Sequence, residues 1–308
     1  MHNFKEVLRA AKERGPITIS VAAAEDDDVM TAVGSAMQAG IAQVILVGDQ
    51  RKIWPRLERA GLQSVLTIIH EPDPVKASQR AVDVVRSGDA NVLMKGLVNS
   101  GDFLRAVLHP DRGLRAEYRL SHVIAYEVHG EGRLCFLTDA AINIAPDLQE
   151  KKEILINALL AMHSMGIVRP NVAVISANEK VSPKMPSTVD AQNLVRMGRD
   201  GVFPESIIEG PIAFDVAVCP AAARHKGLES VISGNVDLFL MPNIETANVA
   251  FKILTHYTKA KSACLVLGAT HPIVMTSRSD TAEGKLYSIA LAATTLARVD
   301  VLNEAVQS

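Results

Sequence analysis

ITISVAAAEDDDVMTAVGSAMQAGIAQVILVG, residues 17–48, has the pattern of a strand, a helix and a second strand. Residues 17–22 and 44–47 are short apolar runs rich in Val and Ile, the residues that favour strands. Residues 28–38 between them are amphipathic, and Gly40 just after them is a helix stop signal. The segment therefore predicts a βαβ unit, whose two strands are parallel.

The same alternation continues on the C-terminal side of this segment. Residues 65–69 and 92–94 are two more apolar runs, and residues 74–85 between them have helical spacing. Strands that alternate with helices at this distance are typical of an α/β protein with a mainly parallel sheet.

The pattern changes near Ser121, where a second domain is predicted to begin. Residues 123–128 and 134–138 are two strands joined by a short polar turn, which predicts an antiparallel hairpin. A long amphipathic helix is expected over 147–165, and further strands are expected at 172–175, 216–219, 238–240 and 264–267.

We therefore predict two α/β domains with an active-site cleft between them, since small-molecule sites occur preferentially at domain interfaces. The first domain would comprise residues 1–122 and 270–308, completed by a C-terminal helix at about 282–297. The second would comprise residues 123–269.

Composition narrows the class of protein. The chain has 308 residues, 48% of them hydrophobic, and a formal charge of −2, which argues against a nucleic-acid or membrane-surface protein. Cys135, Cys219 and Cys264 form no metal-binding spacing and are expected to be reduced and buried. The N-terminus has no signal-peptide pattern and no apolar run reaches about 18 residues, so we expect a cytoplasmic protein without a metal site.

The segment GATHPIVMTSRSDTAEGKLY, residues 268–287, offers a candidate anion site. It presents Thr276, Ser277, Arg278, Ser279 and Asp280 consecutively before a helix, where backbone N–H groups, hydroxyls and a guanidinium favour phosphate. The alternative is that Ser277, Ser279 or Asp280 merely caps that helix. In that case Glu283, three residues after Asp280, would complete a capping box.

A second basic segment is MKGLVNSGDFLR, residues 94–105. Lys95 lies at the carboxyl end of a strand, where α/β sheets present ligand-binding loops, and Ser100 and Arg105 lie in the helix that follows. Arg105 is equally consistent with a solvated helix residue, and Lys95 with a lysine whose stem is covered while its ammonium reaches water.

Two further segments follow predicted strands of the second domain. Residues 176–190 form a polar loop that carries Lys180 and Lys184, and residues 241–248 carry Asn243. Either segment is also consistent with an ordinary surface loop or turn. The chain has no GxGxxG, Walker A, HExxH or GxSxG motif, which argues against the enzyme classes that use them.

Taken together and in order, these segments resemble the phosphate acetyl/butyryl transferase family, and its butyryl branch most closely. The carriers are residues 94–108, 174–191, 209–217, 237–254 and 267–292, which span most of the chain. The resemblance implies a two-domain, three-layer α/β fold similar to the isocitrate/isopropylmalate dehydrogenase group. It also implies a homodimer or larger homo-oligomer without a permanently bound cofactor.

The resemblance further implies reversible transfer of a short acyl group, butyryl first, between coenzyme A and inorganic phosphate, by direct transfer in a ternary complex. The family's catalytic Ser-Arg pair falls on Ser277 and Arg278, and its phosphate-side arginine falls on Arg105. We add as candidate substrate-binding residues those that the segments above present: Lys95, Ser100, Thr276, Lys180, Lys184 and Asn243.

One position departs from the family pattern. The acetyl branch has an acid seven residues after the catalytic serine as the base for coenzyme A, and the residue here is Gly284. Glu283 and Asp280 are the nearest carboxylates and become the candidate bases. The alternatives are an acetyltransferase, a homologue that binds coenzyme A or acyl phosphate without turnover, and a decarboxylating dehydrogenase on a related fold, for which no convincing metal-binding aspartates are present.

Overall fold

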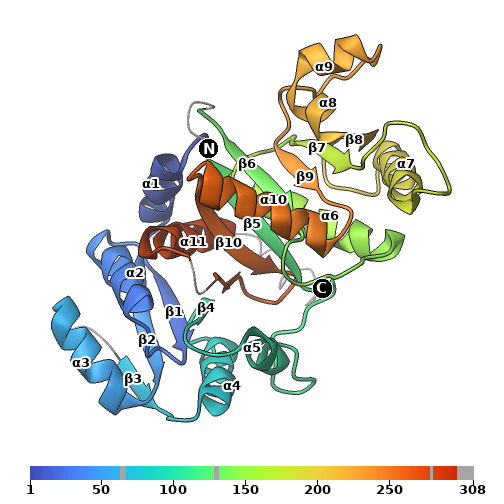
Figure 1. Cartoon of the computed structure of the whole chain (residues 1–308). Helices are drawn as coiled ribbons and strands as arrows, with labels where there is room; N and C mark the ends of the chain where they lie inside the picture. The colour runs from blue at the N-terminus through green and yellow to red at the C-terminus, as the bar shows by residue number, and fades with distance from the viewer. Residues whose placement is uncertain (63–66, 128–131, 278–279, 297–308) are drawn as a thin grey trace. The chain divides into compact units, whose positions relative to one another are not determined.

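The computed structural model describes residues 1–62, 67–127, 132–277 and 280–296 (Figure 1). The chain divides into two compact units. The N-terminal unit comprises Phe4–Glu117 together with the chain from Ser262 onward, and the central unit comprises Tyr118–Lys261 with Met1–Asn3. The sequence places the two boundaries at 122/123 and 269/270. In the structure the two boundaries fall at 117/118 and 261/262. The strand over 261–267 pairs with a strand of the N-terminal unit.

The N-terminal unit contains six strands in the order β3-β2-β1-β4-β11-β10. The first five run parallel to one another, and β10 is antiparallel to β11. The strands are β1 (Ile17–Ala22), β2 (Ala42–Gly48), β3 (Thr67–His70), β4 (Val92–Lys95), β10 (Lys261–Leu267) and β11 (Ile273–Val274). The helices are α1 (Phe4–Arg14), α2 (Asp27–Gln38), α3 (Gln50–Ala60), α4 (Pro74–Arg86), α5 (Ser100–Val107) and α11 (Ala282–Thr295).

The opening βαβ segment forms as its sequence predicts. Ile19 of β1 lies beside Val44 of β2 and Val92 of β4, so β1 is a central strand, which explains its nearly continuous apolar sequence. Asp26 caps α2 by accepting a hydrogen bond from the N–H of Val29, and Gly40 follows its end with a φ of 72°.

The C-terminal helix α11 belongs to this unit. It packs against α1 and α2, and the ring of Phe4 stacks on that of Tyr287 with centroids 4.4 Å apart. Almost every residue of α11 after Gly284 is buried, which accounts for the many apolar residues in its sequence.

The central unit contains five strands in the order β5-β6-β9-β7-β8. The antiparallel pair β5–β6 confirms the predicted hairpin strands, and the other pairs are parallel. The strands are β5 (Ser121–Glu127), β6 (Leu134–Thr138), β7 (Asn171–Ile175), β8 (Ile207–Ile212) and β9 (Leu238–Leu240). The helices are α6 (Leu148–Ser164), α7 (Pro186–Arg199), α8 (Phe214–Val218), α9 (Pro220–His225) and α10 (Ile244–Tyr257).

Two sequence-based expectations are wrong. The strand expected at 216–219 falls in the short helix α8, and the strand of this region is β8, just before it. Cys219 is exposed rather than buried, Cys135 is half-buried, and only Cys264 is a core residue; all three are free thiols. None of the described helices is long and apolar enough to cross a bilayer.

Candidate functional site

The loops after β4 and β11 lie at one edge of the N-terminal sheet. The two strands are parallel and adjacent, with Val274 beside Met94, so the chain leaves both at the same edge. This arrangement brings Lys95 and Gly96 near Thr276 and Ser277, although about 180 residues of sequence separate them. The carboxyl edge of a parallel sheet is the usual location of ligand sites in α/β proteins.

Gly96 allows the loop after β4 to approach β1 closely. The N–H of Gly96 donates to the carbonyl of Ala22 at 2.8 Å, and that of Leu97 donates to the carbonyl of Ala23 at 2.7 Å. A Cβ atom at position 96 would lie 2.3 Å from the Ala23 oxygen, closer than Cβ atoms approach other non-bonded atoms in proteins. Only glycine fits this loop as it is folded.

The side chain of Lys95 folds back onto the loop that follows β4. Its side chain is buried, and the ammonium donates to the carbonyl oxygens of Gly96 at 3.2 Å and Val98 at 3.1 Å. Asn99 then caps α5 by accepting from the N–H of Gly101, which leaves Ser100 exposed in the first turn. Lys95 thus orders the loop that leads to Ser100.

Arg105 lies one turn further along α5, with its side chain 74% exposed. Its Nη1 donates to Oδ1 of Asp102 at 2.6 Å, an i,i+3 pair on the same helix. An exposed pair of this kind contributes at most about 1 kcal/mol. A phosphate could therefore displace Asp102 at little cost.

The segment that leaves β11 forms a closed turn. Thr276 is buried, the N–H of Ser277 donates to Oδ2 of Asp280 at 2.7 Å, and the N–H of Asp280 donates to the Ser277 carbonyl at 3.1 Å. Arg278 and Ser279, between these two residues, lie outside the described residues. The turn brings Ser277 and Asp280 together at the start of α11.

The cap of α11 is not the one expected from sequence. Thr281 is the N-cap, with its Oγ1 accepting from the N–H of Gly284 at 3.1 Å, so the Asp280–Glu283 capping box is not formed. Glu283 instead accepts a hydrogen bond from the hydroxyl of Tyr287 at 2.5 Å. Asp280 closes the preceding turn because its carboxylate points back along the chain to Ser277.

The central unit contains a cavity of about 650 Å³ at the corresponding edge of its own sheet. Segments that follow β6, β7, β8 and β9 all contribute to its wall, which is mostly apolar. The walls comprise Ala145, Pro146, Lys151, Ile175, Ser176, Ala177, Met185, Pro186, Ser187, Ala213, Phe214, Pro242, Asn243 and Thr246. A cavity of this size accommodates a drug-sized ligand.

A few polar groups line this cavity. The hydroxyls of Ser176 and Ser187 lie 2.9 Å apart, and the buried ammonium of Lys151 donates to Oδ2 of Asp190 at 2.6 Å. Asn243 caps α10, with its Oδ1 accepting from the N–H and the hydroxyl of Thr246.

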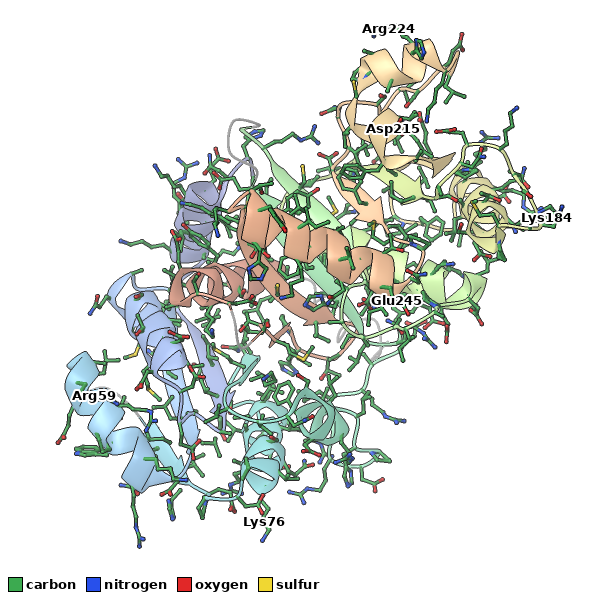
Figure 2. All side chains as sticks on the ribbon, in the orientation of Figure 1. Arg59, Lys76, Lys184, Asp215, Arg224 and Glu245 are labelled. Atoms are coloured by element: carbon green, nitrogen blue, oxygen red, sulfur yellow. The ribbon has the colours of Figure 1, made fainter. Side chains whose placement is uncertain are left out.

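The two lysines predicted for this region do not line the cavity. The N–H of Lys180 donates to Oδ1 of Asn178, and the side chain of Lys184 projects outward from the loop (Figure 2). The loop that carries them is anchored through Glu179, whose Oε1 accepts from Lys226 at 3.0 Å. Lys226 also pairs with Asp215 of α8 at 3.1 Å.

These contacts shift two pKa values. The hydrogen bond from Lys226 lowers the pKa of Asp215, and hydrogen bonds to Glu179 and then Asp215 raise the pKa of Lys226. The network therefore favours the charged forms of both groups and links the 176–190 loop to α8.

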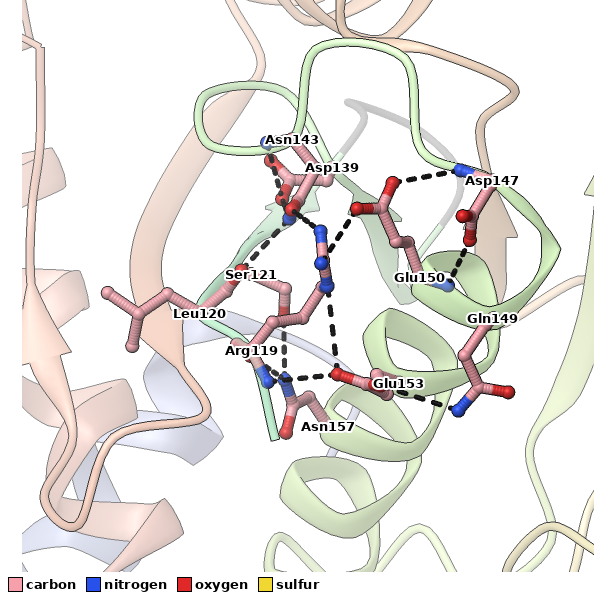
Figure 3. Close-up of polar contacts among 10 residues, drawn as sticks. All are labelled: Arg119, Leu120, Ser121, Asp139, Asn143, Asp147, Gln149, Glu150, Glu153 and Asn157. Atoms are coloured by element: carbon pink, nitrogen blue, oxygen red, sulfur yellow. Dashed lines mark hydrogen bonds and ion pairs between the residues drawn. The ribbon is translucent and has the colours of Figure 1, made fainter. Parts of the chain in front are cut away.

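The loop after β6 contributes residues that the sequence did not single out (Figure 3). The buried carboxylate of Asp139 accepts from the N–H groups of Ala141, Ile142 and Asn143 and from the Asn143 side chain at 2.6 Å. Asp139 therefore fixes the loop that supplies Ala145 to the cavity wall.

Arg119 connects the same loop to α6 (Figure 3). Its Nη1 donates to Oδ1 of Asn143 at 2.9 Å, and its Nη2 lies 2.7 Å from Oε1 of Glu150. Glu150 in turn forms a capping box with Asp147 at the start of α6. In the described part of the chain, no group of three His, Cys, Asp or Glu residues could hold a metal ion.

Comparison with known proteins gives the family. Residues 69–293 match the family model described as phosphate acetyl/butaryl transferase. The chain belongs to this family. The phosphate butyryltransferase of Clostridium acetobutylicum is 43% identical over 94% of this chain and 97% of its own length. The phosphate acetyltransferase of Thermotoga maritima is 35% identical over 94% of this chain and 98% of its own length.

Two solved structures, named as a phosphotransacylase and a phosphotransacetylase, share the fold. A branched-chain phosphotransacylase from Enterococcus faecalis has a TM-score of 0.80 and 30% identity, covering 91% of this chain and 99% of its own. A phosphotransacetylase from Streptococcus pyogenes also has a TM-score of 0.80, at 20% identity, covering 96% and 99%. The expected α/β class is thereby confirmed.

Proposed function

We propose that this chain transfers a short acyl group, butyryl by preference, between coenzyme A and inorganic phosphate. The observation that carries the proposal is the 43% identity to phosphate butyryltransferase over nearly the full length of both chains. The edge of the N-terminal sheet supports it, because Thr276 and Ser277 stand there beside the loop of Lys95 and Gly96. Coenzyme A is a substrate of the reaction, and no permanently bound cofactor is required.

Phosphate would bind at this edge through charge and hydroxyl donors. Arg105, which forms an exposed pair with Asp102 among the described residues, is available to a phosphate, and Arg278 follows Ser277 in sequence. The Ser277 hydroxyl would donate to a phosphoryl oxygen or to the oxyanion of the tetrahedral intermediate. These donors act on the charge that develops in the transition state.

The reaction consists of one displacement at the acyl carbonyl. In the direction of acyl-CoA synthesis, the coenzyme A thiolate attacks the carbonyl carbon of acyl phosphate, the carbon–oxygen bond to phosphate breaks, and phosphate leaves with the electron pair. The thiol proton passes to solvent or to phosphate. Alignment of both substrates in a ternary complex contributes about 7–11 kcal/mol to such a transfer.

The candidate bases Asp280 and Glu283 each hold another group. Asp280 accepts from the Ser277 N–H, and Glu283 accepts from the Tyr287 hydroxyl. Each contact uses one oxygen of a carboxylate that has about four lone-pair sites, so both groups remain candidate bases. The alternative to a carboxylate base is ionisation of the thiol by nearby positive charge, which lowers a thiol pKa without a dedicated base.

The cavity of the central unit supports the acyl-CoA part of the proposal. Its walls are mostly apolar, with Met185 and Phe214 among them, and Ser176, Ser187 and Asn243 supply a few polar contacts. A pocket of this composition suits the apolar acyl chain and the pantetheine arm, in which apolar and amide groups alternate. Lys180 and Lys184 lie on the loop beside it, where the phosphates of coenzyme A would pass.

Two observations keep alternatives in view. Two relatives named phosphate acetyltransferase are 35% and 36% identical over most of the chain, which favours acetyl transfer as the second candidate. Gly284 replaces the acid of the acetyl branch, which favours a homologue that binds coenzyme A or acyl phosphate without turnover. We further propose a cytoplasmic homodimer or larger homo-oligomer as the working form.

The test is phosphate-dependent release of free coenzyme A thiol, run in parallel with butyryl-CoA and acetyl-CoA. We expect release with both, a higher kcat/KM for butyryl-CoA, and a loss of orders of magnitude in Arg278→Ala with the fold unchanged by circular dichroism. Release that does not need phosphate would refute acyl transfer to phosphate, and a preference for acetyl-CoA would assign the acetyl branch. Binding of coenzyme A without any release would indicate the non-catalytic homologue.

A further inference from the structure

Lys285 is a buried lysine that the sequence did not mark as functional. It is the fourth residue of α11, and only 4% of its surface is exposed. Side chains of a helix tilt toward its N-terminus, and Lys285 follows this direction into the turn that precedes α11. Its ammonium donates to the carbonyl oxygen of Asp280 at 2.5 Å.

A short chain of hydrogen bonds runs from Lys285 through Asp280 to Ser277. Asp280 and Ser277 exchange two hydrogen bonds, one through the Asp280 carboxylate and one through its N–H. Lys285 holds the carbonyl of that same Asp280. A change in the position of the ammonium is therefore transmitted to the turn that carries Ser277.

The charge on Lys285 is only partly neutralised by the described residues. The carboxylate within ion-pair distance is that of Asp28, whose Oδ2 lies 3.9 Å away, beyond hydrogen-bond range. Asp28 is 59% exposed, so water screens its charge. A buried ammonium with such a distant counter-ion leaves positive potential beside Asp280 and the Ser277 to which it is hydrogen-bonded, because burial weakens screening by water.

We propose that Lys285 is a positioning residue for phosphate: it holds the Ser277–Asp280 turn in place and adds buried positive charge beside it. This inference rests on the proposed function for the identity of the anion. It assigns phosphate affinity, rather than affinity for acyl-CoA, to a residue that has no predicted contact with either substrate.

The first experiment is Lys285→Met, which keeps the length of the side chain and removes the charge and the donor. We expect the phosphate KM to rise roughly tenfold, the effect of about one charge-assisted hydrogen bond, with the butyryl-CoA KM unchanged. Lys285→Arg, which retains both properties, should restore the phosphate KM to within about threefold of the wild type. An unchanged phosphate KM in a folded Lys285→Met protein would overturn the proposal, as would an equal rise in both KM values.

The second variant, Asp28→Asn, removes the counter-ion and leaves the turn untouched. We expect its phosphate KM to fall about twofold at low ionic strength and to return to the wild-type value in high salt, since an exposed pair is weak and screened. A merely structural lysine would not produce this fall. An unchanged or higher KM at low salt would count against the proposal even where Lys285→Met fails to fold.

The matched control is Lys52→Met in α3. The Lys52 ammonium also lies 3.9 Å from a carboxylate, that of Asp49, but its side chain is 64% exposed. We expect no change in the phosphate KM. Isothermal titration with inorganic phosphate repeats each comparison without turnover, so failure of the proposed reaction is distinguished from failure of this inference. Wild-type protein that binds no phosphate, or binds it as weakly as Lys285→Met does, would overturn the inference.

Discussion

Gly96→Ala is the most informative single substitution at the edge of the N-terminal sheet. The new Cβ atom would lie 2.3 Å from the Ala23 oxygen and 2.7 Å from the Ala22 oxygen. Both contacts are with backbone atoms, which cannot rotate away as a side chain can. The loop after β4 must therefore move away from β1.

This movement breaks the two hydrogen bonds that join Gly96 to Ala22 and Leu97 to Ala23. Each contributes about 1 kcal/mol, and overpacking strain adds about 1–3 kcal/mol. The sum of these contributions is a loss of about 3–5 kcal/mol in the N-terminal unit. At about 2–4 °C per kcal/mol for a unit of this size, the melting temperature should fall by about 6–20 °C.

Differential scanning calorimetry measures the effect directly as a shift of the melting temperature. Gly101→Ala is the control: its Cβ atom meets only Oδ1 of Asn99, at 3.3 Å, and alanine favours the helix. We expect the control to remain within about 1 kcal/mol of the wild type. A Gly96→Ala protein that melts within about 3 °C of the wild type would refute the close-approach argument.

Two further substitutions test contacts of the central unit. Lys151→Met leaves Asp190 without its buried partner and should lower the free energy of unfolding in urea by about 3 kcal/mol. The double variant Lys151→Met/Asp190→Leu should recover most of this loss, and a single variant as stable as the wild type would contradict the prediction. Lys226→Met should raise the pKa of Asp215 toward its ordinary value in an NMR titration, because the Lys226 hydrogen bond holds it down. A lowered pKa gives stability at neutral pH that is lost as the pH falls through it, so the variant should lose less stability in acid.

The regular parts of the fold could be predicted because each element has a complete local signal. β1 and β2 are apolar runs of the right length, and Gly40 ends the helix between them. β8 could not be predicted, because Gly210 and Pro211 within it are strand breakers in sequence. The structure explains both residues: β8 is the edge strand, where proline is tolerated, and a Cβ atom at position 210 would lie 2.8 Å from Val174.

In the candidate site too, the sequence predicts single segments, whereas the contacts between segments far apart in sequence come from the structure. Sequence alone places Lys95 at the end of an expected strand and Ser277 in the segment after the strand expected at 264–267. The short strand β11 is not predicted, and only its pairing with β4 brings the two loops to one edge. Asp139 and Lys285 were missed because their importance lies in contacts with backbone groups, which leave no spacing pattern. Which of the predicted residues contact substrate stays a prediction, as does the role of Arg278.

Gly284 and its neighbour Lys285 bear on how the coenzyme A thiol loses its proton. It is the third residue of α11, and a side chain there would begin 3.2 Å from the Ser262 carbonyl, against the backbone of β10. A carboxylate at this position would start in a crowded environment, and this chain has none there. The next residue is the buried Lys285, whose charge lies beside the Ser277 turn. Fixed positive charge at this edge would stabilise both the phosphate and the thiolate. The coenzyme A thiol would then ionise to the nucleophilic thiolate without a protein carboxylate taking its proton.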